Sequence, residues 1–456
     1  MPIFQKVLVA NRGEIAARIM RTCKRLGIAT VAIYSEADEG APHTQVADEA
    51  YCVGEAHVTK SYLNIDAIMR VIKETGADAV HPGYGLLSEN ADFVARLDEA
   101  GVTFIGPSTE VMAAMGDKAR ARAIAEAAGV PVVPGTPGAI ASEDEAVAFA
   151  EQVGYPVLVK ASAGGGGIGM KLAKKEKKLR KAVAECQRRG ESAFGNPDVY
   201  IEKYIEQPRH IEVQILADTH GNTLHLFERE CSVQRRHQKV VEEAPSPLVE
   251  RVEGMRQRLC DAAVALARST SYTNAGTIEF ISDQQGNFYF IEMNTRLQVE
   301  HPITEMITGL DIVEWQLRIA AGEALSITQD DVKANGHAIE CRIYAENPAK
   351  SFMPAPGDIT TYEEPAMEGV RVDSGVRENW AITSYYDPMV AKIAAHGGDR
   401  EDARLRMIQA LEAYTIDGLT HNKSMHIKVL QEEVFKDATY HTSWLEGLSF
   451  EDASSD

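Results

Sequence analysis

The sequence has few cysteines, few basic side chains and no long apolar run. None of its six cysteines has the paired spacing of a zinc site, and nothing suggests a secreted disulfide framework, so we expect reduced thiols at positions 23, 52, 186, 231, 260 and 341. Basic residues number 47 against 67 acidic ones, and the formal charge of -20 disfavours binding to nucleic acid. An anionic ligand must therefore meet a local basic site.

The chain also lacks a stretch that approaches a membrane span, and its first residues do not form a basic segment followed by a long apolar core. We therefore expect a cytoplasmic protein without a membrane partner. Hydrophobic residues make up 45% and charged residues 25%, which is typical of a globular chain, and 456 residues are enough for two to four domains.

Residues 6 to 106 alternate between strand-like and helix-like segments. The strands are KVLVA, IATVAIY, ADAV and VTFIG, with helices from Glu14 to about Leu26, near 62–75 and near 89–100. This rhythm predicts an α/β fold whose N-terminal domain, 1–114, contains a parallel, Rossmann-like sheet. The next regions are a central one at 115–336 with an inserted subdomain at about 131–203, an α+β one at 337–447, and an acidic tail at 448–456.

The segment 276–294 predicts a β-hairpin, because the apolar runs GTIEFI and FYFIEMN flank the turn-forming sequence DQQGN. A loop of residues 284–287 would pair Asp283 with Phe288 and place Glu279 opposite Glu292, with Asn294 on the same face. Facing carboxylates repel unless a proton or cation lies between them, and hard oxygen ligands suit Mg²⁺ or Mn²⁺. The alternative is an edge hairpin whose carboxylates face solvent.

A glycine run, ASAGGGGIGM, follows the strand that ends at Lys160. Its amides could approach phosphate oxygens, and the strand-like sequences on either side favour a hairpin lid over a flexible linker. It fits neither the Walker pattern nor a dinucleotide fingerprint. The loops NRGE at 11–14 and HPGYG at 81–85 follow strands of the first sheet, where ligands bind, or are simply tight turns.

Two further segments carry polar groups in the central region. Glu202, Lys203 and His210 could recognise a nucleotide, although Glu202 and Lys203 taken alone favour a surface charge pair. The run QRRHQK at 234–239 concentrates basic groups in an acidic chain and indicates an anion site or an exposed basic turn. Cys231 has no identifiable base beside it, which favours a buried structural thiol.

Arg296, Gln298 and Glu300 alternate and would share one face of an extended segment. Together they could bind a small planar oxyanion and remove its proton. His301 precedes a proline and is interpreted as structural. Arg342 alternates with Glu340 and points into the same cleft or forms a core salt bridge.

The ordered motifs NRGEIAARI, HPGYGLLSEN, MGDK, EKYIEQPRH, QRRHQKVVEEAP, EMNTRLQVEHPITE and GHAIECRIYAE, with the glycine run, resemble biotin carboxylase, a member of the ATP-grasp superfamily. The resemblance extends over about residues 3–447 and identifies the central region as an ATP-grasp domain. It implies ATP- and bicarbonate-dependent carboxylation of biotin. Bicarbonate would attack the γ-phosphate to give carboxyphosphate, which yields CO₂ and phosphate, and phosphate would deprotonate the ureido nitrogen of biotin.

The resemblance also implies roles for individual residues. ATP would be bound by Lys118, Lys160, Gly166, Gly167, Glu202, Lys203, Tyr204, Ile205, His210, Gln234, His237, Glu279 and Glu292. Metal would be held by Glu279, Glu292 and Asn294, and bicarbonate by Lys239, Arg296, Gln298 and Val299. Glu300 would be the base that deprotonates bicarbonate, and Arg342 would bind biotin and stabilise its enolate-like form.

The sequence departs from many relatives at Ile168, where they have arginine, and at Ala163, which shortens the glycine run. No biotin-attachment segment follows the third region, so we expect biotin to be carried by another chain, a biotin carboxyl carrier protein, together with carboxyltransferase subunits. The resemblance favours a homodimer. The final acceptor, for example acetyl-CoA in fatty acid synthesis, propionyl-CoA or pyruvate, stays open.

Two alternatives to this function remain. Another ATP-grasp ligase, of the carbamoyl-phosphate type, would share the ATP and metal residues, but QRRHQKVVEEAP and ECRIYAE would not be expected together in it. A non-catalytic ATP-binding regulatory subunit would be expected to lack part of the set Glu279, Glu292, Arg296, Glu300 and Arg342, and all five are present.

Overall fold

A computed structural model describes residues 3–161, 170–194 and 197–450. The predicted phosphate cradle at Gly166 and Gly167, together with Ala163 and Ile168, lies outside the described residues. No helix within the described residues is long and apolar enough to cross a bilayer.

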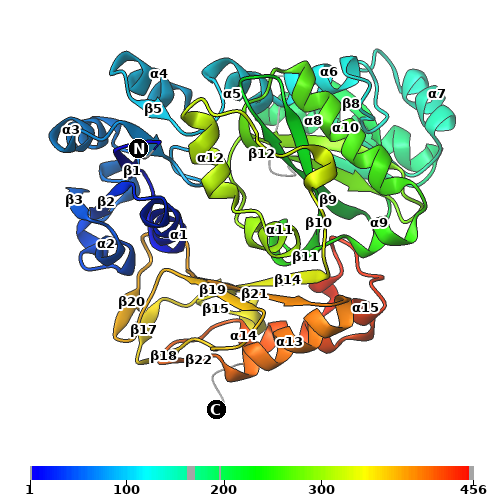
Figure 1. Cartoon of the computed structure of the whole chain (residues 1–456). Helices are drawn as coiled ribbons and strands as arrows, with labels where there is room; N and C mark the ends of the chain where they lie inside the picture. Colours follow the sequence, from blue (N-terminus) through cyan, green and yellow to red (C-terminus); the bar gives the residue numbers. More distant parts are fainter. Residues whose placement is uncertain (1–2, 162–169, 195–196, 451–456) are drawn as a thin grey trace.

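The N-terminal region contains the predicted parallel sheet, with strand order β3-β2-β1-β4-β5 (Figure 1). Its strands are β1 (Lys6–Val9), β2 (Ala29–Ser35), β3 (Glu49–Gly54), β4 (Ala79–His81) and β5 (Thr103–Phe104). Its helices are α1 (Gly13–Arg25), α2 (Pro42–Val46), α3 (Ile65–Thr75) and α4 (Ala91–Glu99). The sequence pattern did not indicate β3 and α2, because β3 alternates only weakly and α2 is barely longer than one turn.

The largest sheet has eight strands in the order β13-β12-β9-β10-β11-β14-β21-β19, and all its neighbours are antiparallel. The strands are β9 (Arg209–Ala217), β10 (Thr223–Arg235), β11 (Gln238–Ala244), β12 (Asn274–Ser282), β13 (Phe288–Asn294), β14 (His337–Tyr344), β19 (Val370–Ser374) and β21 (Met389–Gly397). Because β11 pairs with β14, one sheet continues from the central region into the third.

Helices cover both faces of this sheet. On the central strands, α5 (Thr109–Gly116), α6 (Lys118–Ala127), α9 (Pro247–Arg251) and α10 (Met255–Ser269) share one core with β9, β12 and β13. The opposite face meets α11 (His301–Thr308), α12 (Ile312–Ala320) and the N-terminal region. Asp117 caps α6, accepting a hydrogen bond from the Arg120 amide at 2.9 Å.

The third region packs its own helices against β14 and β21. These helices are α13 (Arg400–Ala413), α14 (Lys423–Gln431) and α15 (Glu433–Lys436). Short strand pairs complete the region: β15 (Glu346–Asn347) with β16 (Met353–Pro354), β17 (Gly357–Ile359) with β20 (Trp380–Ile382), and β18 (Thr361–Glu363) with β22 (Thr415–Asp417).

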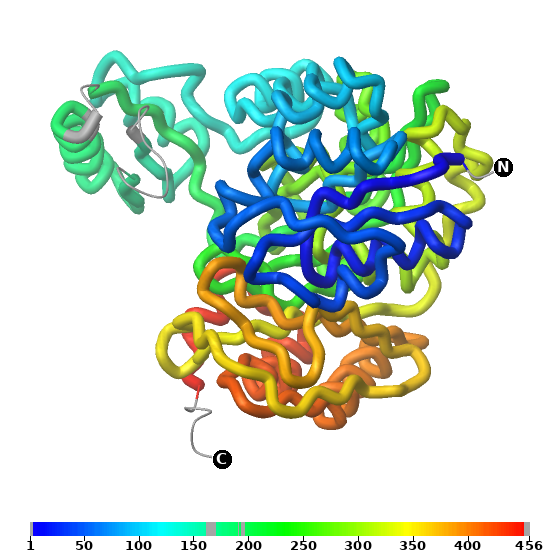
Figure 2. Tube along the Cα trace, turned by 90° about the vertical axis from the view of Figure 1, so that its left-hand side faces the viewer, coloured from blue at the N-terminus to red at the C-terminus, as the bar shows by residue number. Residues whose placement is uncertain are grey.

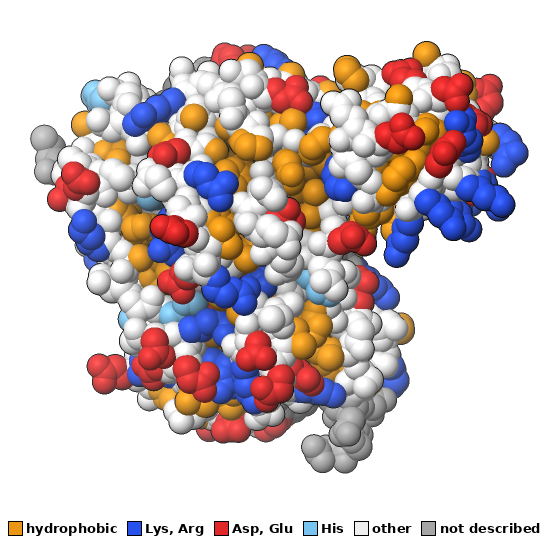
Figure 3. Space-filling view, turned by 90° about the vertical axis from the view of Figure 1, so that its right-hand side faces the viewer, with side chains coloured by type: hydrophobic (Ala, Val, Ile, Leu, Met, Phe, Trp, Pro, Cys, Tyr) orange, Lys and Arg blue, Asp and Glu red, His pale blue; other side chains and the backbone are white. Residues whose placement is uncertain are grey.

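A small subdomain projects from the central region (Figure 2). It contains α7 (Glu143–Val153), β6 (Val157–Ala161), β7 (Met170–Ala173), α8 (Glu176–Phe194) and β8 (Val199–Lys203), with its own apolar core. The strands that flank the glycine run pair antiparallel, Lys160 with Met170, which confirms the predicted hairpin. Lys and Arg side chains gather on this projection (Figure 3), and residues 174–178 are exposed.

The β12–β13 hairpin pairs Glu279 with Glu292, as predicted, but not through the predicted loop. Ser282 rather than Asp283 faces Phe288, so the loop has five residues, 283–287. A register shift of one residue between Glu279 and Phe280 compensates, because Ile291 is an extra residue on β13. The predicted pairing of Asp283 with Phe288 was therefore wrong, whereas the predicted pairing of Glu279 with Glu292 was correct.

Candidate active site

A cavity of about 710 Å³ lies where the three regions meet. The loop NRGE contributes Asn11 and Glu14, HPGYG contributes Tyr84, and the third region contributes Arg342 and Tyr386. The side chain of Asn11 joins the two loops by donating to the carbonyl oxygens of Pro82 (2.7 Å) and Tyr84 (2.8 Å). Ten predicted site residues line the cavity: His210, His237, Lys239, Glu279, Glu292, Asn294, Arg296, Gln298, Val299 and Arg342.

Lys239, on β11, contacts three glutamates at once. Its Nζ lies 2.5 Å from Glu212 Oε2, 2.8 Å from Glu279 Oε1 and 2.7 Å from Glu300 Oε1. Burial alone would lower the pKa of Lys239. The three carboxylates have the larger, opposite effect and raise this pKa well above its ordinary value. The ammonium therefore stays charged, and a bound anion would compete with the glutamates for it.

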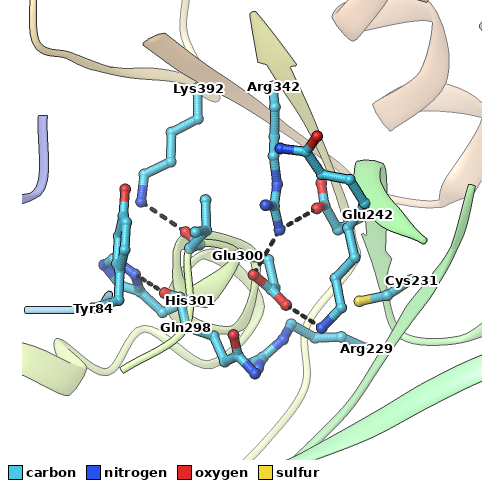
Figure 4. Close-up of polar contacts among 12 residues, drawn as sticks. Tyr84, Arg229, Cys231, Glu242, Gln298, Glu300, His301, Arg342 and Lys392 are labelled. Atoms are coloured by element: carbon cyan, nitrogen blue, oxygen red, sulfur yellow. Dashed lines mark hydrogen bonds and ion pairs between the residues drawn. The ribbon is translucent and has the colours of Figure 1, made fainter. Parts of the chain in front are cut away.

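Glu300 and Arg342 contact each other directly (Figure 4). Arg342 Nη2 lies 2.8 Å from Glu300 Oε2 and 2.6 Å from Glu242 Oε1. Burial alone would raise the pKa of Glu300. Lys239 and Arg342 have the larger, opposite effect and lower this pKa well below its ordinary value. The resting site thus contains an ionised Glu300 between two cations. Arg342 lines the cavity and also forms a buried salt bridge, so both interpretations of this residue are correct.

Glu279 is buried, whereas Glu292 is partly exposed at the cavity. Asn294 Nδ2 donates to Glu279 Oε1 at 2.9 Å, and Gln298 Nε2 donates to the same oxygen at 3.1 Å. Glu279 Oε2 lies 3.0 Å from His210 Nε2. The interpretation that both carboxylates face solvent is therefore wrong. Two carboxylates and an amide oxygen on neighbouring strands form a donor set that fits Mg²⁺.

Arg296 is held by hydrogen bonds to the hairpin and to the N-terminal region. It donates to Asn294 Oδ1 (2.8 Å), Gln298 Oε1 (3.1 Å) and Glu89 Oε2 (3.0 Å). Its guanidinium thereby lies among the residues predicted to bind metal and bicarbonate. Glu89, which belongs to the HPGYGLLSEN motif, was missed as a contributor.

The segment after the hairpin does not continue as the expected extended strand. Glu300 is the residue that precedes α11, with φ -82° and ψ 14°, so alternation does not explain how the side chains meet. Glu300 reaches the site because the chain turns into the helix. His301, its neighbour, is buried, contacts the Gln298 carbonyl oxygen at 2.8 Å and has a pKa lowered chiefly by burial, which agrees with a structural role.

Not all of the predicted residues line the cavity. Lys118 lies 3.6 Å from Glu292, and Gln234 Nε2 lies 3.1 Å from His210 Nδ1, so both lie near its edge. Lys160 and Glu202 form an ion pair within the projecting subdomain. Lys203 donates to the Gly154 carbonyl oxygen at 2.9 Å rather than pairing with Glu202. The prediction of a surface Glu202–Lys203 pair is thus wrong.

Tyr204 and Ile205 follow the last strand of the subdomain and are absent from the described cavity lining. The Tyr204 amide donates to the Pro156 carbonyl oxygen at 3.1 Å, and Ile205 is buried. Both stand at the connection between the subdomain and β9.

The basic run at 234–239 is not a single anion site. Arg235 is buried in an ion pair with Glu346 of the third region and lies over the Tyr344 ring, 5.4 Å from its centroid. Arg236 and His237 form the exposed turn between β10 and β11. Cys231 is buried and has a pKa raised chiefly by burial, which confirms a structural thiol rather than a nucleophile.

Local sequence patterns missed Lys392, on β21. Its Nζ donates to the Val299 carbonyl oxygen at 2.7 Å (Figure 4). The same Nζ lies 3.3 Å from Glu14 Oε1, to which Tyr84 OH also donates. The loops NRGE and HPGYG signalled Glu14 and Tyr84, whereas nothing around Lys392 in the sequence signals a site. These contacts position the segment that carries Val299.

An ATP-grasp-type sheet with a projecting glycine-hairpin subdomain, and a cavity lined by lysine, arginine and carboxylates, define an ATP-dependent ligase. Three family models match the chain: biotin carboxylase, N-terminal domain, at residues 3–112; carbamoyl-phosphate synthase L chain, ATP binding domain, at 117–328; and biotin carboxylase C-terminal domain at 340–447. The flanking matches favour biotin carboxylase over a carbamoyl-phosphate-type ligase.

Individual relatives agree. The chain is 54% identical to "Biotin carboxylase 2" of Bacillus subtilis over 97% of this chain and 99% of that protein. The crystal structure of the biotin carboxylase subunit of pyruvate carboxylase superposes with a TM-score of 0.90 at 50% identity, covering 97% of this chain and 98% of that one. The bicarbonate-bound biotin carboxylase domain of a thermophilic 2-oxoglutarate carboxylase superposes with a TM-score of 0.92 at 47% identity, covering 97% and 98%. The chain belongs to the biotin carboxylase family.

Proposed function

We propose that this biotin carboxylase transfers the carboxyl group of bicarbonate to biotin presented by a separate carrier protein, through carboxyphosphate. The observation that carries this proposal is the convergence of Lys239, Arg296 and Glu300 with Arg342 from the third region around one cavity. The carboxylate base Glu300 contacts both Lys239, a cation for the oxyanion, and Arg342, the group assigned to biotin.

Bicarbonate would bind against Lys239, Arg296, Gln298 and the Val299 backbone. Lys239 would then share its charge with the anion instead of with three glutamates, which reduces the stabilisation of ionised Glu300 and makes that carboxylate a stronger base. Glu300 would accept the bicarbonate proton as the oxyanion attacks the γ-phosphate. Lys392 and Glu14 hold the Val299 segment in place during this step.

Glu279, Glu292 and Asn294 would hold Mg²⁺ or Mn²⁺. When bound, the ion neutralises charge on the phosphates of ATP. The uncharged amides of Asn294 and Gln298 already donate to Glu279 and hold its carboxylate toward the site. The structure of the Hydrogenobacter thermophilus 2-oxoglutarate carboxylase domain, 48% identical with a TM-score of 0.86 over 97% of each chain, is described as a complex with MgADP, ADP and bicarbonate, which supports this assignment.

ATP would contact residues on both sides of the cavity mouth. We assign to it Lys118, Lys160, Glu202, Lys203, Tyr204, Ile205, His210, Gln234 and His237, with Gly166 and Gly167 of the glycine run. Lys160 and Glu202 neutralise each other in the ligand-free arrangement, so nucleotide phosphates would replace Glu202 as the partner of Lys160. Movement of the projecting subdomain would bring both toward the cavity and exclude water.

Carbonyl and N–H groups of biotin would lie beside Arg342, whose charge stabilises the enolate-like ureido oxygen while phosphate removes the nitrogen proton. We further propose a homodimer that works with a biotin carboxyl carrier protein and carboxyltransferase subunits. The Hydrogenobacter thermophilus structure is described as a domain dimer, and another relative is described as one subunit of pyruvate carboxylase, which supports such an assembly.

Carbon-labelled bicarbonate tests the proposal directly. Purified protein with ATP and Mg²⁺ should transfer label to free biotin slowly and to a biotinylated carrier domain faster, because the carrier supplies positioning energy. Transfer that is equally slow to both would contradict the carrier assignment. Folded protein that binds ATP but labels neither would contradict the function itself.

A further inference from the structure

Two buried carboxyl groups beside the active site, Glu242 and Glu340, take no part in the mechanism above. They lie directly opposite each other on the paired strands β11 and β14, and both are fully buried. Directly paired residues of neighbouring antiparallel strands have Cβ atoms about 4.5–5.5 Å apart and share one face of the sheet. The two carboxyl groups therefore face each other in a part of the protein that water does not reach.

Direct partners for this pair are scarce among the described residues. Glu242 Oε1 lies 2.6 Å from Arg342 Nη2, but Arg342 is shared with Glu300 (Figure 4). Glu340 has no cation within ion-pair distance, and neither of its oxygens accepts a hydrogen bond within the described part of the chain. An ionised carboxylate without a partner in such a place is strongly unfavourable, and protonation relieves it.

The charges of the surrounding elements lead to the same conclusion. Six buried carboxyl groups gather here: Glu14, Glu212, Glu242, Glu279, Glu300 and Glu340. Four cations accompany them: Arg229, Arg342 and Lys392, which are buried, and Lys239, which is partly exposed at the cavity. Glu242 interacts with Arg342, Glu300 and Lys239, and Glu340 interacts with Lys392, Glu242, Arg342 and Glu300. Anions outnumber cations, and Glu340 has the fewest contacts.

We propose that Glu242 and Glu340 share one proton at neutral pH and that this pair, which then carries one negative charge instead of two, positions Arg342 for the reaction with biotin. With the proton on the pair, one negative charge fewer competes with Glu300 for Arg342, so the guanidinium contacts both Glu242 and Glu300 and is drawn less strongly toward β11. Ionisation of both carboxyl groups would hold the guanidinium against the sheet and reduce its effect on the ureido oxygen. The proposal rests on the proposed biotin-binding role of Arg342.

The directions of the pKa shifts of these glutamates agree with the geometry. Burial raises the pKa of Glu340 well above its ordinary value, and Glu242 raises it further despite the opposing effect of Lys392. Burial also raises the pKa of Glu242, to about 7, against the effect of Arg342. The pKa of Glu243, the next residue along β11, is instead lowered by Arg400 and His337, which outweigh burial. Glu242 and Glu243 are adjacent and buried on one strand, yet their pKa values shift in opposite directions, so Glu243 serves as a control for Glu242.

Infrared difference spectra of the purified full chain at neutral pH test the shared proton. Glu340→Gln should remove one protonated-carboxyl band relative to the natural protein, whereas the control Glu243→Gln should remove an ionised-carboxylate band. If the double variant Glu242→Gln/Glu340→Gln removes only ionised-carboxylate bands, the pair does not hold a proton and the proposal is wrong. This readout does not depend on activity, so it is separate from the test of the proposed function.

Kinetics with biotin test the positioning role. Glu242→Ala removes the carboxyl group that lies 2.6 Å from Arg342 and should raise KM for biotin about tenfold, the effect of one lost polar contact, without changing KM for ATP. Glu242→Gln, which is neutral but retains a hydrogen-bond acceptor, should restore KM for biotin to within about threefold of the natural value. If Glu242→Gln is as impaired as Glu242→Ala, a negative charge is required and the proposal is overturned.

Discussion

Glu300 links the two halves of the proposed reaction, because one of its oxygens contacts Lys239 and the other contacts Arg342 (2.7 and 2.8 Å). From the sequence we assigned bicarbonate activation and biotin binding to separate groups in separate regions. The structure joins them through a single carboxylate. Substitution of either residue therefore changes the electrostatic environment of the other.

Glu300→Gln should block bicarbonate-dependent ATP cleavage by at least about a hundredfold, the loss expected when a general base is removed, while nucleotide affinity changes little. Arg342→Ala should impair biotin carboxylation more than ATP binding, because its guanidinium stabilises charge on the ureido oxygen. Turnover and calorimetric nucleotide affinity, measured for both variants, check this. Loss of ATP binding in either folded variant would contradict the assigned roles.

The double variant is informative because the residues are in contact. Its loss should be smaller than the sum of the two single losses, since each single change already disrupts the same ion pair. Losses that add fully would show that Glu300 and Arg342 act independently and that their contact has no consequence.

Glu292→Gln should reduce activity strongly and raise the Mg²⁺ concentration needed for half-maximal rate, because one anionic ligand is lost at nearly constant size. Glu126→Gln is a matched control, since Glu126 is about half exposed on α6 and does not line the cavity. A Glu292→Gln variant with natural rate and natural metal response would place the metal site elsewhere.

At the residue scale, ten residues that the sequence predicted for the site line the cavity, and one prediction holds only because two deviations cancel. The pairing of Glu279 with Glu292 depends on the bulge at Ile291, which no turn rule indicated. Lys392 could not be found from local patterns, because its role depends on β21 lying beside β14 in a sheet assembled from segments far apart in sequence. The Arg235–Glu346 pair was missed for the same reason.

At the scale of elements, β11 carries functional groups on one face and a structural ion-pair network on the other. Glu243 accepts from Arg400 Nε at 2.6 Å and lies 2.8 Å from His337 Nε2, which ties β11 to α13 and β14. Strand and helix limits were predictable where apolar periodicity was strong, as in α1 and β2. The continuation of the sheet from β11 to β14 was not, because strand pairing across about a hundred residues leaves no local pattern.

Glu243→Gln should lower the free energy of unfolding by about 3–5 kcal/mol at neutral pH, because Arg400 loses its buried partner. Arg400 and His337 lower the pKa of Glu243 below its ordinary value of 4.5, so this contribution is complete above pH 4.5 and disappears as the pH falls below it. Urea unfolding at neutral and acid pH measures it. If the difference in unfolding free energy between the variant and the natural protein did not shrink in acid, the ion pair could not be its cause.

At the scale of the whole molecule, the cavity exists only when all three regions are assembled. The N-terminal region contributes Glu14 at the start of α1, and Gly375 of the third region lies against that start. A Cβ atom on Gly375 would lie 2.7 Å from the Glu14 amide nitrogen. Close packing between distant regions therefore fixes the position of Glu14 relative to Lys392.

Gly375→Ala should displace α1 and lower the free energy of unfolding by about 1–3 kcal/mol through overpacking. The variant should remain folded, and its turnover should fall because Glu14 is displaced. Gly116→Ala is the matched control, since an added Cβ there meets no atom within 4 Å. Thermal unfolding and turnover of both variants decide the matter. Equal, unchanged turnover in the two would show that the α1 contact does not position the site.

The central claim is that this cavity activates bicarbonate by phosphoryl transfer from ATP, and heavy-oxygen-labelled bicarbonate tests it most directly. With biotin, Mg²⁺ and ATP, the account predicts that each phosphate released carries one labelled oxygen, because the bicarbonate oxygen that attacks the γ-phosphate leaves with it. Mass spectrometry of the phosphate detects the label. Phosphate that carries no label, with ADP still released in a biotin-dependent manner, would mean that water attacks ATP and would contradict the account.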